Sequence, residues 1–199
     1  MNLGIFARLA ALLALSAHVT GMPFDVSPLG LKAPTVVPTP DKLDMTPLLE
    51  ALRAQGLNAT FGGIKSSAAS NTIETAERRS NTLQKRVIPN CITFGSTPYQ
   101  DDCNTAKQAV IDTAMNYDLA PYECVDIQYG SCSSYFCNWD PCAYINADTD
   151  WWGAVMGDII YWCINLEGQC GFYDGTGPAY QIDIEHSGTE LPPYVAATC

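Results

Sequence analysis

The chain has 199 residues, 47% of them hydrophobic, and a formal net charge of −11, which excludes a chain disordered throughout and allows one domain preceded by leader segments. Residues 87–199 carry fifteen acidic side chains and one base, Lys107, and so a formal charge of −14. Because Lys and Arg supply most of the affinity for phosphates, this balance excludes a nucleic-acid-binding protein and a protein that acts on anionic membranes.

Residues 1–21 have the plan of a secretory signal peptide. Arg8 lies near the start, an apolar run follows from Leu9 to Leu15, and small residues lead to Gly21. The run is far shorter than the roughly 20 apolar residues that cross a bilayer, and no second candidate follows it. We therefore expect a secreted, extracellular protein without a membrane anchor.

Residues 22–86 differ from the rest of the chain in composition. They are rich in proline and small polar residues, with few large apolar side chains after Leu57, so we expect a largely disordered propeptide that cannot build a core. One short helix is predicted within residues 44–56, where three leucines share a face and Gly56 can end the helix.

Lys85 and Arg86 form a dibasic pair at the point where composition, cysteine content and charge all change. Exposed, flexible stretches are where proteolytic nicking concentrates, and dibasic pairs are the sites of kexin-type processing proteases. Arg78-Arg79 is a second dibasic pair in the same segment. We expect a kexin-type protease to cut after Arg86 and to leave residues 87–199 as the mature domain.

All nine cysteines follow residue 90. In an oxidising compartment this density predicts a disulfide framework of at most four bridges, with one cysteine that stays free or pairs between chains. Eight paired cysteines allow roughly a hundred connectivities, so the pairing stays open. The candidates are Cys91, Cys103, Cys124, Cys132, Cys137, Cys142, Cys163, Cys170 and Cys199.

The mature domain contains two predicted helices and several predicted strands. Residues 101–117 repeat apolar side chains at helical spacing, and residues 148–168 do so more strongly, with Thr149 or Asp150 as the expected cap and Gly168 as the expected end. Strands are predicted from alternating or short apolar runs. These runs are residues 123–130, 142–147, 169–175 and 180–185. The order predicts an α+β fold, a small disulfide-rich αβ sandwich with two helices on one face of an antiparallel sheet, in a split βαβ arrangement.

Candidate catalytic residues are weakly specified. Only His186 remains in the mature domain for imidazole chemistry, and an ordinary surface histidine is the simpler interpretation. Glycoside hydrolysis needs paired carboxylates, such as Asp148 with Asp150 or Asp140 with Asp158, although the first pair more simply initiates a helix. We predict no enzyme and no catalytic residue, with a small glycoside hydrolase as the alternative.

Metal sites are also weakly specified. Residues 146–150 lack the glycine and the later glutamate of a calcium loop. Cys132, Cys137 and Cys142 have the spacing of metal ligands, but disulfides are the better interpretation in a secreted chain. We therefore predict no metal and no cofactor.

The four tryptophans all fall within residues 139–162. Trp152 lies on the face of the second helix that is expected to pack, whereas Trp151 and Trp162 lie off that face. If exposed, these two would anchor a protein partner or stack on a sugar ring.

Short motifs in residues 91–170 resemble a known family. They are Cys91 with Thr93-Phe94, Asp102-Cys103 at a helix start, Gly130-Ser131-Cys132, Asp158-Ile159-Ile160, and the pair Gly168 and Gly171. This pattern resembles the necrosis-inducing factor family of fungal secreted cysteine-rich effectors and, more loosely, the killer toxins of smut fungi. Cys137 and Cys142 lie in an insertion that does not align with the family.

The resemblance implies a killer-toxin-like fold and a secreted protein that acts on host or competitor cells by binding, with no catalytic residue. The expected partner is a host or competitor protein or a cell-wall glycan. The alternative function is a carbohydrate-binding or glycoside-hydrolase-like protein that uses exposed tryptophans and paired carboxylates.

Overall fold

The computed structural model describes residues 31–40, 43–63, 89–92, 95–176 and 179–188. The predicted signal peptide, the Lys85-Arg86 pair and Cys199 lie outside the described residues.

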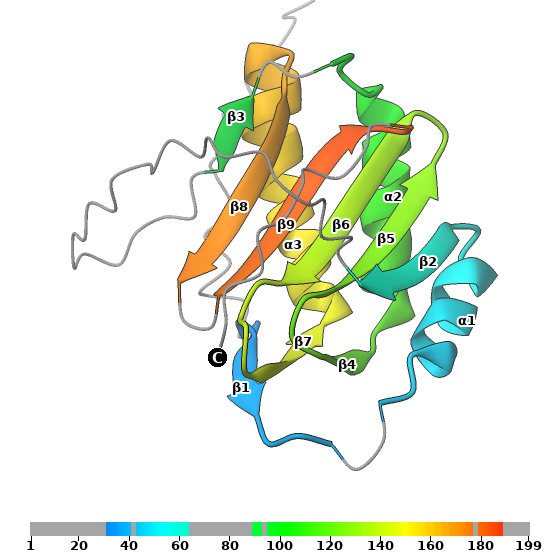
Figure 1. Ribbon diagram of the computed structural model, residues 1–199. Coiled ribbons are helices and arrows are strands. Elements are labelled where there is room, and N and C mark those ends of the chain that lie inside the picture. Colours follow the sequence, from blue (N-terminus) through cyan, green and yellow to red (C-terminus); the bar gives the residue numbers. More distant parts are fainter. Residues whose placement is uncertain (1–30, 41–42, 64–88, 93–94, 177–178, 189–199) are drawn as a thin grey trace, which may run out of the picture.

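A six-stranded antiparallel sheet forms the centre of the molecule (Figure 1). Its strands, in spatial order, are β2 (Asn58–Gly63), β5 (Glu123–Tyr129), β6 (Cys132–Asn138), β9 (Ala179–His186), β8 (Cys170–Thr176) and β3 (Asn90–Ile92). All seven residues of β6, the strand between β5 and β9, are buried.

A second, three-stranded sheet has the order β1 (Thr35–Val37), β7 (Tyr144–Asp148) and β4 (Asn116–Leu119). Both of its pairings are antiparallel. The strands predicted at residues 123–130, 180–185 and 169–175 are confirmed as β5, β9 and β8, and the one predicted at 142–147 is confirmed as β7, although it belongs to this second sheet.

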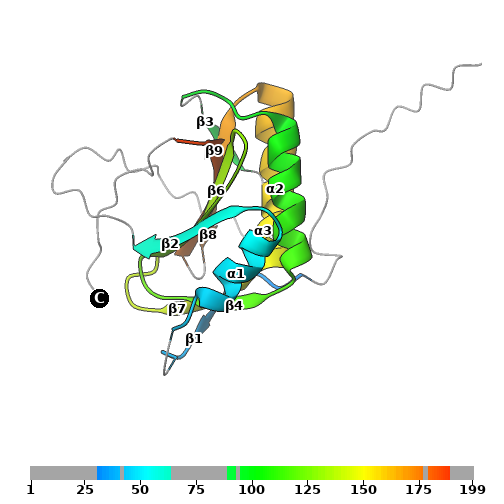
Figure 2. The same ribbon diagram turned by 90° about the vertical axis from the view of Figure 1, so that its right-hand side faces the viewer.

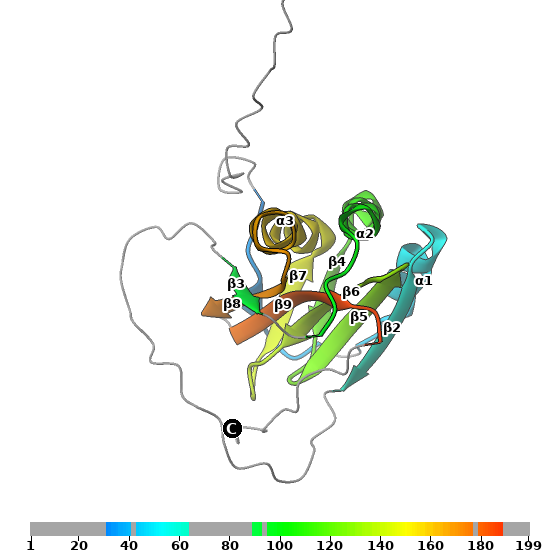
Figure 3. The ribbon, with the colours of Figure 1, turned by 90° about the horizontal axis from the view of Figure 1, so that it is seen from above.

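Two helices lie side by side on one face of the six-stranded sheet (Figure 3). They are α2 (Gln100–Thr113) and α3 (Thr149–Ile159), and the π-helix η2 (Ile160–Asn165) continues α3. Trp152 of α3 is fully buried, packs edge-to-face on Phe136 of β6, and donates its indole N–H to Ser134 Oγ at 3.1 Å. The core therefore sits between this helical layer and the sheet.

Both predicted helices are confirmed, with changes at their ends. Ala114 adopts a left-handed conformation (φ 49°) that ends α2 at Thr113, so Tyr117 belongs to β4 instead of extending the helix. The cap of α3 is Asp148, whose side chain accepts the backbone N–H of Trp151, and neither Thr149 nor Asp150. Gly168 follows the helical segment with φ +64°, as expected.

The expectation that residues 22–86 are largely disordered is wrong for residues 31–40 and 43–63. The helix predicted within residues 44–56 is present as α1 (Thr46–Ala54), and it contacts β2 and α2 (Figure 2). Leu52 of α1 is 0% exposed and lies in the same core cluster as residues of β5 and β6. A segment poor in apolar residues cannot build a core alone, but it needs only one apolar face to join a core that the rest of the chain supplies.

Three disulfides are present among the described residues: Cys91–Cys163, Cys103–Cys132 and Cys124–Cys137. They join β3 to η2, α2 to β6, and β5 to β6. Cys142 is also disulfide-bonded, whereas Cys170 is free and buried. The fold is thus a disulfide-rich α+β fold, as predicted, and its bridges indicate an oxidising, extracellular compartment.

None of the helices in the described part of the chain has the length and apolar character needed to span a membrane.

Candidate functional site

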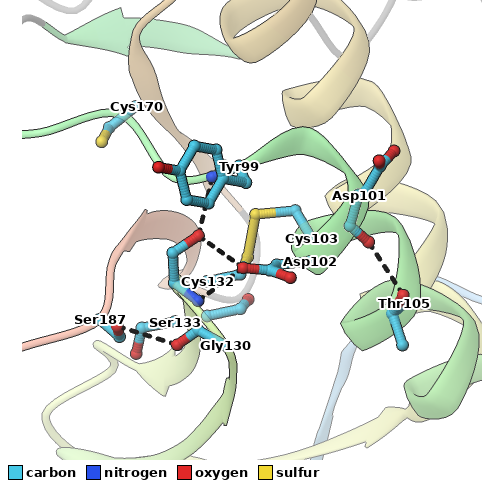
Figure 4. Close-up of a disulfide and its surroundings, with 12 residues drawn as sticks. Tyr99, Asp101, Asp102, Cys103, Thr105, Gly130, Cys132, Ser133, Cys170 and Ser187 are labelled. Carbon is cyan, nitrogen blue, oxygen red and sulfur yellow. Dashed lines mark hydrogen bonds between the residues drawn. A yellow bond between two sulfur atoms is a disulfide. The ribbon is translucent and has the colours of Figure 1, made fainter.

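Three turns of the chain meet at one end of the six-stranded sheet, around the Cys103–Cys132 disulfide (Figure 4). We call this region the Tyr99 corner, and its residues are Tyr99, Asp102, Cys103, Gly130, Ser131, Cys132 and Ser187. The first three come from the start of α2, the next three from the turn between β5 and β6, and Ser187 follows β9.

A short hydrogen-bond chain holds the Tyr99 corner together. The hydroxyl and the backbone N–H of Ser131 both donate to Asp102 Oδ2, at 2.8 and 2.7 Å. The backbone N–H of Tyr99 in turn donates to Ser131 Oγ at 2.8 Å. The two bonds from Ser131 lower the pKa of Asp102, so this carboxylate stays ionised and fixes the turn against the first turn of α2.

The β5–β6 turn has no room for a side chain at Gly130. This glycine has φ +55°, and a Cβ built on it would clash with the carboxylate of Asp102. Ser187 closes the corner from the other side, because its hydroxyl donates to Gly130 O at 3.0 Å and its N–H donates to Ser131 O at 2.7 Å. The backbone of the corner is therefore held by a disulfide and hydrogen bonds from three segments.

Tyr99 projects from this fixed backbone and is 75% exposed. Tyr129, directly before Gly130, is also exposed. A large aromatic side chain on a rigid backbone is the usual anchor of a protein interface, because little conformational entropy is lost when it is buried by a partner. The anchors considered from the sequence are tryptophans, and Tyr99 is not among them. The sequence feature that marks Tyr99 is its position just before the Asp101-Asp102 helix start.

A second cluster, which we call the acidic face, lies on the side of the six-stranded sheet away from α2 and α3. Its residues are Asp126 of β5, Ser133 and Tyr135 of β6, and Asp183 and Glu185 of β9. Asp126, Tyr135 and Asp183 pair in one row across three strands, and Ser133 pairs with Glu185. Since strand side chains alternate between faces, their neighbours Ile127, Phe136 and Ile184 point to the helices, and the acidic face points the other way.

Two residues of the acidic face that carry carboxyl groups are deeply buried. Asp183 is 4% exposed and Glu185 is 6% exposed. Asp183 Oδ1 and Glu185 Oε2 have no hydrogen-bond partner within the part of the chain that the structure describes. Asp126 is better satisfied, because it accepts a hydrogen bond from Ser133 Oγ at 3.0 Å.

Burial raises the pKa of each of these three carboxyl groups. For Asp183 the rise is large, since the charges of Glu185, Asp174 and Asp126 add to the desolvation. Burial is also the main reason why the pKa of Glu185 and of Asp126 lies above the ordinary range. The same environment raises the pKa of Tyr135 to about 12. The acidic face therefore holds protons at a pH where exposed carboxyl groups have lost them.

The structure does not place both predicted tryptophans at the surface. Trp151, which was considered as an anchor only if exposed, is 7% exposed, because α3 is buried on most of its sides and not on one face only. Trp162 is partly buried and packs edge-to-face on Tyr161, with ring centroids 5.1 Å apart.

Two of the carboxylates considered for catalysis, Asp148 and Asp140, serve local structure. Asp148 caps α3, as its helix-initiating interpretation predicted. Asp140 accepts the backbone N–H groups of Cys142 and Ala143 in the turn after β6, and Asp158 is buried in α3. His186 is partly buried at the end of β9, with Nδ1 3.0 Å from Ser187 O.

The alternative interpretation of Cys132, Cys137 and Cys142 as metal ligands is wrong, because all three are disulfide-bonded. No group of three His, Cys, Asp or Glu residues in the described ranges is arranged to hold a metal ion.

Comparison with known proteins finds no match for this chain among protein-family models, curated proteins or solved structures.

Proposed function

We propose that this chain is a fungal secreted effector or killer-toxin-like protein, which acts on host or competitor cells by binding and not by catalysis. The observation that carries the proposal is Tyr99, a 75% exposed aromatic side chain on a backbone held by a disulfide and by hydrogen bonds from Ser131. A partner that covers this side chain gains apolar burial at little cost in ordering the protein.

Two motifs of the family resemblance support this proposal, because they meet in space. Asp102-Cys103 and Gly130-Ser131-Cys132 are joined by a disulfide and by the two hydrogen bonds from Ser131 to Asp102. Gly171, from the last motif, lies against Cys163 of the Cys91–Cys163 bridge, where a Cβ would clash. Cys91, Asp102-Cys103, Gly130-Ser131-Cys132 and Gly171 thus belong to, or pack against, the disulfides of the fold.

The proposal is tested by measuring saturable binding of the labelled protein to plant cells and to competing fungal cells. We expect Tyr99→Ala to weaken binding by about 2 kcal/mol, or roughly 30-fold, as for a central interface residue. Leu166→Ala is the matched control, because Leu166 is 58% exposed just after η2, outside the Tyr99 corner. Binding that is absent, or that Tyr99→Ala leaves unchanged, contradicts the proposal.

The acidic face favours a carbohydrate-active protein as a second candidate. A buried carboxyl group with a raised pKa is what a general acid in glycoside hydrolysis requires, and Asp126 and Asp183 occupy one row of the sheet. Cell-wall polysaccharides should then be retained or cleaved by the protein, with cleavage lost in Asp183→Asn and binding weakened in Trp162→Ala. If the unaltered protein neither binds nor cleaves these polysaccharides, this candidate is excluded.

We further propose that the chain is made as a preproprotein, with residues 1–21 as signal peptide and a kexin-type cut after Arg86. The first cysteine lies only five residues after that cut, and the change in charge and composition at residue 86 supports it. Intact-mass analysis after reduction tests this: a fragment that begins at Val87 is expected, and a single chain that begins near Met22 contradicts it.

A further inference from the structure

The segment before the proposed cleavage site occupies one edge of the six-stranded sheet. β2 pairs with β5 along its whole length, from Asn58 opposite Gln128 to Gly63 opposite Glu123. Without β2, the backbone N–H and C=O groups on that side of β5 would lose their partners, and such an open edge is prone to pair with other chains. The segment therefore completes the sheet.

The same segment also supplies part of the core. Leu48 and Leu52 of α1 and Leu57 and Ala59 at the start of β2 are all buried in the main cluster. That cluster includes Val125 and Ile127 of β5 and Val110 of α2. Removal of the segment would expose apolar side chains on both sides of this contact.

The elements of this segment are tied to one another and to a third place in the fold. Arg53 of α1 donates to the carbonyl oxygen of Ala59 in β2 through Nη2 at 2.7 Å and Nε at 3.1 Å. β1 pairs with β7, from Thr35 opposite Asn146 to Val37 opposite Tyr144. The segment thus pairs with the rest of the chain in both sheets.

No disulfide can link this segment to the rest of the protein, because the first 90 residues contain no cysteine. From these contacts we propose that residues 31–63 remain bound after cleavage as a noncovalent second chain, seated on the edge of β5. The mature protein is then a two-chain complex, and β5 becomes available to another strand only when this chain leaves. The inference rests on the proposed cut after Arg86 and is independent of the proposed binding through Tyr99.

Cleavage of the full chain with a kexin-type protease tests this, followed by native mass spectrometry and gel filtration at micromolar concentration. We expect the two fragments to migrate together and to separate in denaturant without any reductant. Separation under native conditions would overturn the inference. A denaturing gel shows whether the cut occurred; if it did not, the processing proposal fails, and a protease site placed within residues 64–88 of the full chain tests retention by itself.

A pair of substitutions on α1 tests whether retention depends on the buried face. Leu52→Asp places a charge in the core and should release the cut fragment at least tenfold faster, whereas Ala54→Asp places the same charge on the exposed side and should leave it bound. Equal release from the two variants contradicts the inference. Because Leu52→Asp can impair folding, hydrogen exchange of the β5 amides in the unaltered cut protein gives a second measurement: protection should persist after cleavage and be lost only when the fragment is removed.

Discussion

The leader segment, residues 31–63, and the cysteine-rich domain, residues 89–188, share one core but are held in different ways. In the domain, disulfides join helices and strands that are up to 72 residues apart in the chain. The described contacts of the leader are noncovalent, and they include strand pairing, the packing of leucines and the hydrogen bonds of Arg53. Cross-links would persist after the proposed cut, whereas noncovalent packing can be reversed, so the core would combine a permanent part with a removable one.

The largest expected effect comes from the bridges of the domain. Replacing Cys91 and Cys163 by Ala opens a loop of 72 residues and should lower the free energy of unfolding by about 4 kcal/mol. Replacing Cys124 and Cys137 opens a loop of 13 residues and should cost about 3 kcal/mol. Urea unfolding without reductant measures both, and an equal or reversed order would show that loop length does not govern the stability of the domain.

The packing of the leader should contribute almost as much to the free energy of unfolding as the disulfides do. Leu52→Ala leaves a cavity in a fully buried position and should cost about 3 kcal/mol of unfolding free energy in the uncut chain. Leu166→Ala, at a position that is 58% exposed, should change it by less than about 0.5 kcal/mol. If urea unfolds Leu52→Ala and the unaltered chain at the same concentration, the leader does not share the core.

A smaller effect is expected in the Tyr99 corner of the domain. Gly130→Ala meets both a positive φ and the Asp102 carboxylate, and should cost about 2 kcal/mol. Gly168→Ala has a similar φ, +64°, but open space around it, so it should cost only about 1 kcal/mol. The difference between the two variants in thermal or urea unfolding isolates the clash with Asp102. No difference would mean that the Asp102–Ser131 contact does not constrain the turn.

The last prediction concerns pH, and it distinguishes the acidic face from the Tyr99 corner. The folded-state pKa of Asp183 lies above its unfolded value. The stability that this group contributes is therefore fully present below about pH 3.8 and is lost as the pH rises through the folded-state pKa. The unaltered protein should therefore lose stability between pH 4 and pH 8, and Asp183→Asn should lose less. Asp102 affects stability in the opposite direction, because its pKa is lowered in the folded state. The stability it contributes is present above its unfolded pKa and is lost as the pH falls. Urea midpoints at the two pH values measure this, and equal losses in both proteins would contradict it.

The sequence predicts the elements with a clear apolar period and misses those whose burial depends on distant partners. α3 and β5 were predicted because their apolar residues repeat at the spacing of a helix and of a strand. β6 was missed although it is central, since its serines are buried with partners elsewhere: Ser134 accepts from Trp152, and Ser133 donates to Asp126. No local pattern shows that a polar residue will find such a partner.

The candidate sites were missed for a similar reason. Asp126 and Asp183 lie 57 residues apart in the chain, and only the order β5-β6-β9 brings them into one row. Helix α1 was predicted from its leucines, but its contact with α2 was not, because composition averaged over residues 22–86 concealed one well-packed stretch. The sequence therefore indicates which segments form helices and strands better than it indicates which segments join the core.

The free cysteine of β8 has a practical use. Cys170 is buried and burial raises the pKa of its thiol, so the native protein should react slowly with thiol reagents although other cysteines are oxidised. Opening of the edge formed by β3 and β8 exposes it, since Ile92 pairs with Cys170 there. The rate of thiol labelling thus reports how often this edge of the sheet opens, at the opposite side of the sheet from the leader.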